Sequence, residues 1–268
     1  MRIATYAATK ALLDKHNLRA RKSLGQNFLI DPHVLGKIIR AANITKQDTV
    51  LEIGPGLGSL TQELLDHAGH VIAVELDKNL AQILKETLPL AEVVQSDILD
   101  YKIPNHVTKV VANLPYYVTT PIVMHLLENH SFKSITVMVQ KEVAERMAQK
   151  GDHGALSLAV EYHAKAEIAA YVPPNSFLPR PQVGSCVVHM DVLETPPVTV
   201  DKQMLFANIK AGFGKRRKTL VNCLYSSGLY PLSKEEFANL LKSCGFSENI
   251  RGEALSLKDW AKLTEVLQ

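Results

Sequence analysis

Residues 49–58 have the sequence Thr-Val-Leu-Glu-Ile-Gly-Pro-Gly-Leu-Gly, and this stretch decides the fold. Its first half, Thr49–Ile53, is apolar and β-branched, which predicts a buried strand that ends at a glycine cluster. Residues 59–67 then repeat leucine at helical spacing. Glycines at such a turn let the backbone approach a ligand closely, and the following helix directs its N–H groups at that ligand. The stretch therefore predicts a strand–turn–helix unit with room for a nucleotide-like ligand.

The same alternation continues along the chain. Further short apolar runs predict strands, and amphipathic stretches between them predict helices. The strands are expected at residues 70–74, 91–95, 107–112 and 134–139, and the helices at 78–88 and 119–128. Strands separated by helices of this length indicate an α/β fold with a mostly parallel sheet and helices on both faces.

The pattern changes after residue 151. A helix at 155–164 and strands at 166–172 and 185–192 are expected first, around a proline-rich loop at 173–181. A linker at 194–197 precedes four helical patterns at 202–211, 215–226, 233–243 and 256–267. Ser233 and Glu236 form a capping box at the third of these. We therefore predict two domains, residues 1–195 and a small all-helical domain at 196–268.

The composition is that of a soluble globular protein. Of 268 residues, 46% are apolar and 21% are charged. No apolar run reaches the ~18–20 residues of a membrane span, and charges within the first 18 residues argue against a secretory signal. The three cysteines, Cys186, Cys223 and Cys244, are odd in number and widely spaced, so we expect small buried hydrophobes in a reducing cytosol, with no disulfide framework and no metal site.

The formal net charge of +3 is unevenly distributed. Residues 1–34 carry +4, residues 35–197 carry −5, and residues 198–268 carry +4. Basic ends around an acidic middle suggest a polyanionic partner, although basic termini are often simply solvated.

Acidic side chains follow two of the expected strands. Glu75 ends the second strand, 21 residues after Gly54, where an acid can accept hydrogen bonds from ribose hydroxyls. The dinucleotide fingerprint needs glycine where this chain has Ser59, so NAD is disfavoured. Asp97 follows the third strand, where it can reach an adenine amino group. Two structural alternatives stay open, a tight turn without a ligand for the glycines and a helix cap or turn residue for Asp97.

Residues 113–117, Asn-Leu-Pro-Tyr-Tyr, form the most specific motif and follow the fourth strand. The exocyclic amine of adenine is a poor nucleophile because its lone pair is delocalised into the ring. The side-chain carbonyl of Asn113 and a backbone carbonyl before or at Pro115 can accept the two protons of that amine, which exposes the lone pair. Proline fixes the backbone, and Tyr116 offers a stacking face for the base.

Taken together, these motifs resemble those of S-adenosylmethionine-dependent adenine-N6 methyltransferases, and most closely the rRNA adenine dimethyltransferases of the KsgA type. Four further segments carry the resemblance: residues 22–29 (KSLGQNFL), 176–183 (SFLPRPQV), 213–220 (FGKRRKTL) and 251–256 (RGEALS). It extends from about Arg21 to the last residue. It implies a Rossmann-like methyltransferase domain with a basic N-terminal segment in residues 1–195, and a helical RNA-binding domain in 196–268.

The resemblance also implies residue roles. Asn27, Leu29, Gly54, Glu75, Asp97 and Asn113 would contact S-adenosylmethionine, and Asn113, Pro115 and Tyr116 would be the catalytic set. Phe177 would sandwich a flipped adenine from the side opposite Tyr116. The implied substrate is 16S rRNA in the small ribosomal subunit precursor. Two adjacent adenosines of a terminal hairpin loop would each receive two methyl groups during late assembly in the cytoplasm. Nothing in the sequence requires more than a monomer, so we expect one.

Two observations support an RNA substrate independently of the resemblance. An enzyme that acts on a base must unstack it, and aromatic faces such as Tyr116 and Phe177 can offset that cost. Four adjacent cations, Lys215, Arg216, Arg217 and Lys218, are expected to open a helix and to bind phosphate, with an ordinary solvated surface as the alternative.

Three rival functions remain open. A large-subunit rRNA methyltransferase of the macrolide-resistance type would share the core motifs, although the segments at 213–218 and 251–256 favour the small-subunit type. A DNA adenine methyltransferase would need a separate sequence-reading domain, and none is evident. A non-catalytic RNA-binding assembly factor on the same fold is disfavoured by the intact residues Asn113, Pro115 and Tyr116.

Overall fold

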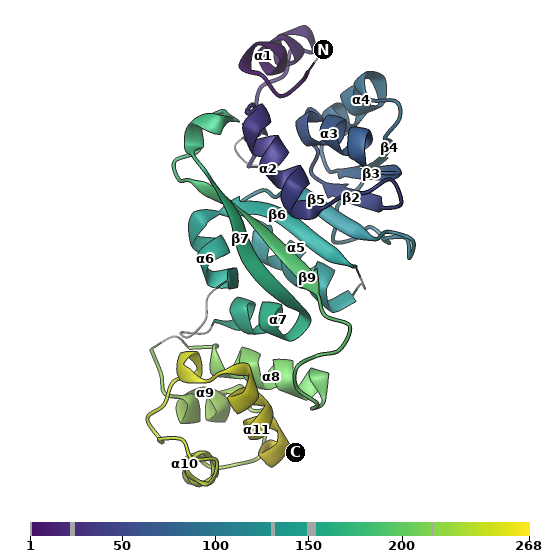
Figure 1. Ribbon diagram of the computed structural model, residues 1–268. Helices are drawn as coiled ribbons and strands as arrows, with labels where there is room; N and C mark the ends of the chain where they lie inside the picture. Colours follow the sequence, from purple (N-terminus) through teal and green to yellow (C-terminus); the bar gives the residue numbers. More distant parts are fainter. Residues whose placement is uncertain (1, 22–24, 130–131, 149–153, 216) are drawn as a thin grey trace. The chain divides into compact units, whose positions relative to one another are not determined.

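The computed structural model (Figure 1) describes residues 2–21, 25–129, 132–148, 154–215 and 217–268. It divides into two compact units, Met1–Glu145 with Lys165–Val192, and Arg146–Ala164 with Leu193–Gln268. The domain boundary at residue 195 stays a prediction. The structure adds that α7 (Ala155–His163) packs with the C-terminal helices, because its Leu158 and Tyr162 belong to their core.

A seven-stranded sheet forms the centre of the first unit, in the order β4-β3-β2-β5-β6-β9-β7. The strands are β2 (Thr49–Ile53), β3 (His70–Glu75), β4 (Glu92–Gln95), β5 (Lys109–Asn113), β6 (Ser134–Gln140), β7 (Ala164–Val172) and β9 (Ser185–Val192). Neighbours from β4 through β6 are parallel, and β9 is antiparallel to β6. The predicted α/β fold with a mostly parallel sheet is therefore confirmed. The register aligns Ile53 with Val74 and Ala112, so these strands end at one edge of the sheet.

Helices cover the sheet because its strands are apolar on both faces. On one face Val50, Val71 and Val111 pack with α2 (Pro32–Ala42) and α3 (Ser59–His67) in one buried cluster. The next residues along the strands, such as Leu51 and Ile72, point to the other face and are buried as well. Such a sheet needs a layer on each side, which is why the strands lack a polar face.

Three helices and a small sheet of the first part of the chain were not predicted. The helices are α1 (Tyr6–Lys15), α2 and α6 (Lys141–Ala148), and the sheet pairs β1 (Phe28–Leu29) with β8 (Phe177–Leu178). The start of α2 carried a readable signal, since Asp31 caps the helix by accepting from the His33 N–H at 3.0 Å and Pro32 occupies its first position. The helices that were predicted in this part of the chain are present as α3, α4 (Lys78–Thr87) and α5 (Thr119–Asn129).

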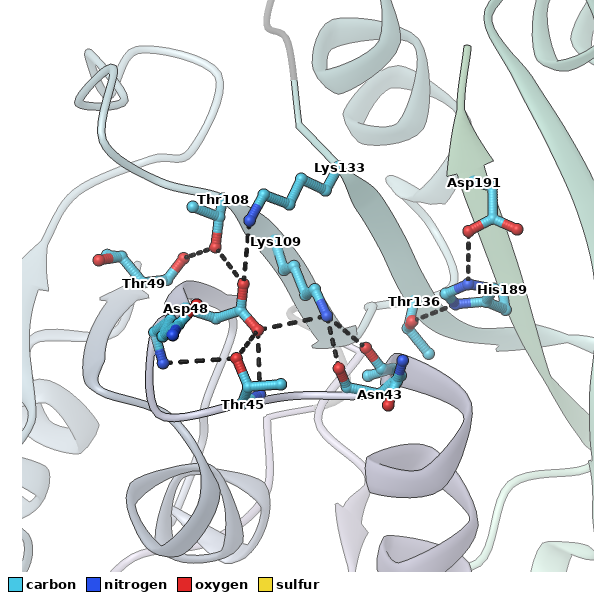
Figure 2. A network of polar contacts seen from close by, with 12 residues as sticks. Asn43, Thr45, Asp48, Thr49, Thr108, Lys109, Lys133, Thr136, His189 and Asp191 are labelled. Atoms are coloured by element: carbon cyan, nitrogen blue, oxygen red, sulfur yellow. Dashed lines mark hydrogen bonds and ion pairs between the residues drawn. The ribbon is translucent and has the colours of Figure 1, made fainter. Parts of the chain in front are cut away.

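A buried ion pair ties α2 to the sheet at the amino ends of the strands (Figure 2). The Lys109 ammonium lies 3.3 Å from the Asp48 carboxylate and donates to the Ala42 and Asn43 carbonyls at the end of α2. Asp48 also accepts from Thr45 and Thr108. Although burial alone would raise the pKa of Asp48, these hydrogen bonds and Lys109 together lower it to about 2. The network lies at the edge of the sheet opposite the glycine turn, and we assign it a structural role.

In the second unit, one buried cluster draws residues from α7, α8 (Lys202–Gly212), α9 (Leu220–Ser227), α10 (Lys234–Ser243) and α11 (Leu257–Leu267), and it includes the fully buried Trp260 of α11. The predicted capping box is confirmed, because Ser233 and Glu236 each accept the backbone N–H of the other. The three cysteines are buried, as expected, and the structure has them as free thiols.

One helix start was predicted wrongly. The helix expected at residues 215–226 begins at Leu220, with Thr219 as its N-cap. Lys215, Arg217 and Lys218, the basic residues before it that the structure describes, lie outside the helix, and the Lys218 N–H donates to the Lys215 carbonyl at 3.0 Å. The partial positive charge of a helix N-terminus repels cations, so a basic run is a poor first turn.

Among the described residues, no helix is long and apolar enough to cross a membrane. No group of three or more His, Cys, Asp or Glu side chains in the same part of the chain could hold a metal ion.

Candidate active site

A pocket of the first unit lies at the carboxyl ends of β2, β3, β4 and β5, closed over by residues 25–29 and the start of α5. Eight of the predicted site residues line it: Asn27, Leu29, Gly54, Glu75, Asp97, Asn113, Pro115 and Tyr116. The parallel sheet explains this convergence, since motifs that follow successive strands in the sequence meet at one edge in space.

The glycine turn between β2 and α3 has the conformation that its sequence requires. Gly54, Gly56 and Gly58 have φ angles of +64°, +63° and +90°, a region that L-residues with side chains rarely adopt. At Gly58 a Cβ atom would also lie 2.6 Å from the Leu88 side chain and 2.8 Å from that of Leu84. The turn thus brings bare backbone to the pocket while α4 packs tightly behind it.

Glu75 ends β3 and is held rigidly. One carboxyl oxygen accepts from the Gly56 N–H at 3.0 Å and the other from the Asp77 N–H at 2.8 Å, and the residue is 6% exposed. Burial raises the pKa of Glu75, and these backbone hydrogen bonds oppose that rise by favouring the carboxylate. The result is an acid with fixed orientation on the pocket wall.

Glu52 is a pocket residue to which the sequence assigned no role. It lies in β2 beside the glycine turn, lines the pocket and is 1% exposed. Its Oε2 atom has no hydrogen-bond partner within the described part of the chain. Burial raises the pKa of Glu52 to about 8, and the nearby Glu75 carboxylate adds to this effect. A carboxyl group inside an otherwise apolar strand was the signal that could have identified it.

Asp97 is a turn residue that also lines the pocket, and its contact with an adenine amine stays a prediction. Its Oδ1 accepts from the Leu99 N–H at 3.0 Å, as in a turn-forming aspartate. The residue nevertheless lines the pocket, half-buried between Ser96 and the apolar Ile98. A turn that fixes one carboxyl oxygen also fixes the other, so Asp97 can offer an oriented acceptor to a ligand.

The side chain of Asn113 is oriented by the N-terminal segment. Its Nδ2 donates to the Asn27 carbonyl at 3.2 Å, which leaves Oδ1 to accept from a ligand. The Asn27 side chain in turn donates to the Gly25 carbonyl at 3.0 Å. Gly25 has a φ of +61°, and a Cβ atom there would lie 3.2 Å from the Tyr117 ring. Residues 25–27 are therefore packed against the Asn-Leu-Pro-Tyr-Tyr turn.

The two backbone carbonyls of that turn, those of Leu114 and Pro115, differ in the hydrogen bonds that they already accept. The Pro115 carbonyl already accepts from the Val118 N–H at 3.3 Å and from the Thr119 hydroxyl at 3.0 Å. A carbonyl oxygen has two lone pairs, so Pro115 has no acceptor capacity left. The Leu114 carbonyl has no such partner among the described residues, and it is the backbone acceptor available next to Asn113.

Tyr116 is half-buried in the pocket wall. Its hydroxyl lies 2.7 Å from the hydroxyl of Ser185, the first residue of β9. Burial raises the pKa of Tyr116, which therefore stays a neutral phenol at neutral pH. Its neighbour Tyr117 is 59% exposed at the same pocket.

The other predicted substrate residues lie outside this pocket lining. Phe177 on β8 is 3% exposed, pairs with Leu29 of β1, and packs into the core cluster around α2. Lys215, Arg217 and Lys218 are exposed residues of the second unit, and Arg216 lies outside the described residues. Residues 22–24 of the segment 22–29 lie outside them as well.

Comparisons with known proteins identify the family to which this chain is similar. A family model described as "Ribosomal RNA adenine dimethylase" matches residues 17–268. The chain is 46% identical to "Ribosomal RNA small subunit methyltransferase A" of Alkaliphilus oremlandii, over 99% of this chain and 98% of that protein. The protein of that name from Clostridioides difficile is 44% identical over 99% of this chain and 97% of its own length.

Two solved structures are also similar to this chain over most of its length. A dimethyladenosine transferase from Plasmodium falciparum matches with a TM-score of 0.73 and 28% identity, covering 88% of this chain and 95% of that one. The 23S rRNA methyltransferase ErmE matches with a TM-score of 0.69 and 27% identity, covering 90% of this chain and 99% of that one.

The fold and the pocket define an S-adenosylmethionine-dependent methyltransferase. Its pocket fits that cofactor, with rigid carboxyls at Glu75 and Asp97 for polar groups and apolar walls at Leu57 and Ile98. Because the family model spans nearly the whole chain and relatives of full length exceed 40% identity, the chain belongs to the ribosomal RNA adenine dimethylase family.

Proposed function

We propose that this enzyme methylates N6 of two adjacent adenosines in a terminal hairpin loop of 16S rRNA, twice each, during late assembly of the small ribosomal subunit in the cytoplasm. The small-subunit specificity rests on the segments at 213–220 and 251–256 and on the names of the relatives that are 44–46% identical.

One observation carries the chemistry. Asn113 Oδ1 and the Leu114 carbonyl are two acceptors at the same turn that no other group of the described protein uses, while the Pro115 carbonyl is already occupied. Two acceptors facing one exocyclic amine can take both of its N–H groups. The nitrogen then becomes pyramidal and its lone pair is free to attack. Bound S-adenosylmethionine supplies the electrophile, a methyl group activated by the adjacent sulfonium.

The remaining site residues position the two reactants. In this proposal Asn27, Leu29, Gly54, Glu75, Asp97 and Asn113 hold the cofactor, with Glu75 on the ribose hydroxyls and Asp97 on the adenine amine. Pro115 fixes the turn, and Tyr116 stacks on the flipped target base. Catalysis then comes from positioning and from preorganised acceptors, without a covalent intermediate. The methylated nitrogen is cationic and acidic enough to release its extra proton to water, so no strong base is needed.

The proposed role of Phe177 needs a further condition. Since its side chain is buried among core residues, it can face the target base only if the segment around β8 shifts when RNA binds. Lys215, Arg216, Arg217 and Lys218, within the proposed RNA-binding domain 196–268, would bind phosphates. Three of them are exposed among the described residues, which supports this role.

Methyl transfer to defined RNA particles tests the proposal. Small subunits and 23S rRNA, each prepared without adenine methylation, are incubated with the enzyme and labelled S-adenosylmethionine, and nucleosides are then analysed by mass spectrometry. We expect dimethyladenosine in the small-subunit RNA and none in 23S rRNA. Label in 23S rRNA instead would favour the macrolide-resistance type, to which the similarity with ErmE points. Binding without any transfer would favour a non-catalytic assembly factor.

A further inference from the structure

We propose that Ser185 is a positioning residue of this active site, which holds the ring of Tyr116 in the orientation needed to stack on the target base. The proposal rests on the proposed function, in which Tyr116 is the stacking face. Ser185 lies 69 residues further along the chain, on a strand to which the sequence assigned no site residue.

The contact is short and its serine partner is buried. The two hydroxyl oxygens lie 2.7 Å apart, and Ser185 is 1% exposed. The phenol oxygen is the one hydrogen-bond partner that the described residues give to the Ser185 hydroxyl. Either hydroxyl can donate in this pair, and we assign Ser185 as the donor because its buried proton would otherwise have no acceptor among the described residues. The phenol proton stays free to reach water or a ligand, because Tyr116 is half-buried.

Ser185 is itself anchored by the sheet. It is the first residue of β9, where it is paired with Gln140, the last residue of β6. The residue before it, Gly184, accepts from the Lys141 N–H at 3.0 Å. A hydroxyl on such a strand end has little freedom, so it can serve as a fixed point for a mobile ring.

Tyr116 is held at its other end by the turn. The Val118 N–H and the Thr119 hydroxyl both donate to the Pro115 carbonyl, which closes the backbone around Tyr116. A tyrosine side chain has two rotatable bonds, and fixing the backbone and the phenol oxygen restricts both. A ring held in this way loses little further freedom when a base stacks on it, which is how preorganisation improves binding.

Substitutions that remove the contact from either side test the proposal. Ser185→Ala and Tyr116→Phe each delete this hydrogen bond and keep the aromatic face. We expect each to lower kcat/KM for unmethylated small subunits about 5-fold, the size of one ordinary hydrogen bond. The double variant should match the single ones, because the second change removes nothing more. The affinity of these variants for the cofactor should stay unchanged. Ser185→Thr keeps a hydroxyl and should therefore have a kcat/KM close to that of the wild type.

Two controls separate positioning from a general structural effect. Ser134→Ala removes a buried serine at the far end of the neighbouring strand β6 and should leave kcat/KM and the urea midpoint unchanged. Ring order is read directly from fluorotyrosine at position 116, whose fluorine resonance should shift and narrow in Ser185→Ala. This reading does not depend on methyl transfer, so it stands even if the proposed substrate is wrong.

Three results would overturn the inference: additive losses in the double variant, a parallel loss of cofactor affinity in Ser185→Ala, or an unchanged fluorine resonance. If the wild-type enzyme transfers no methyl group while the fluorine resonance changes as expected, the proposed function fails and the positioning contact remains.

Discussion

Replacing Glu52 by glutamine should stabilise the protein in a pH-dependent way. The carboxyl group is buried and its pKa is raised from 4.5 to about 8. Between these two pH values the unfolded chain has an ionised Glu52 while the folded protein keeps it protonated. Folding must therefore take up a proton, so the free energy of unfolding falls as the pH rises from 4.5 to about 8.

The size of the effect follows from the same values. Each pH unit above 4.5 costs about 1.4 kcal/mol, so the cost at pH 7 is about 3 kcal/mol. Glutamine has nearly the same shape and carries no charge at any of these pH values. Glu52→Gln should thus be about 3 kcal/mol more stable than the wild type at pH 7 and about equal to it at pH 4.5.

Urea unfolding followed by far-UV circular dichroism, at pH values from 4.5 to 9, measures this difference. Glu75→Gln is the matched control, because both Glu75 oxygens accept backbone N–H groups and an amide nitrogen would face one of them as a second donor. That variant should be destabilised. A Glu52→Gln protein whose stability depends on pH just as the wild type's does would refute the reasoning, and so would one less stable at pH 7.

Three further outcomes are expected. Lys109→Met should lower the free energy of unfolding in urea by about 3 kcal/mol, because it leaves the buried Asp48 carboxylate without its closest cation and removes the donor at the end of α2. A loss below about 1 kcal/mol would contradict the network in Figure 2. Gly58→Ala should lower the free energy of unfolding by about 2 kcal/mol and weaken cofactor binding, since φ is +90° there and a Cβ atom would meet Leu88 and Leu84. If stability and the cofactor affinity measured by calorimetry are both unchanged, the turn adapts to the side chain. Replacing the basic residues before α9 by alanine should weaken RNA binding, measured by fluorescence anisotropy, while cofactor affinity stays unchanged. The slope of log affinity against log salt concentration should fall by up to ~0.7 to 0.9 per lost phosphate contact. A fall in cofactor affinity would mean that these charges serve another purpose. The residues replaced are Lys215, Arg217 and Lys218.

The sequence was most informative where a local rule decides the structure. The glycine turn after β2 and the capping box at Ser233 have the predicted geometry, because each depends on residues next to one another. The pocket could be anticipated as well, since parallel strands bring motifs at their carboxyl ends together. The eight residues that line it were thus predictable without knowing any side-chain contact.

Other features depend on distance or on competing local effects. The Tyr116–Ser185 contact joins residues 69 apart, and it follows from the antiparallel β9 strand, whose register no short motif encodes. The free Leu114 carbonyl became distinguishable from that of Pro115 only through Thr119. The predicted start of α9 was wrong because the prediction used helical spacing alone and ignored the repulsion between cations and a helix N-terminus.

The central claim is that Asn113 and the turn after it activate an adenine amine of small-subunit rRNA. The most direct measurement is single-turnover transfer of labelled methyl groups to unmethylated small subunits by the wild type and by Asn113→Ala, with nucleoside mass spectrometry of the product. We expect dimethyladenosine from the wild type and at least a hundredfold slower transfer from a folded Asn113→Ala protein, about the lower limit for loss of a preorganised acceptor. Dimethylation by Asn113→Ala at the wild-type rate would contradict the account.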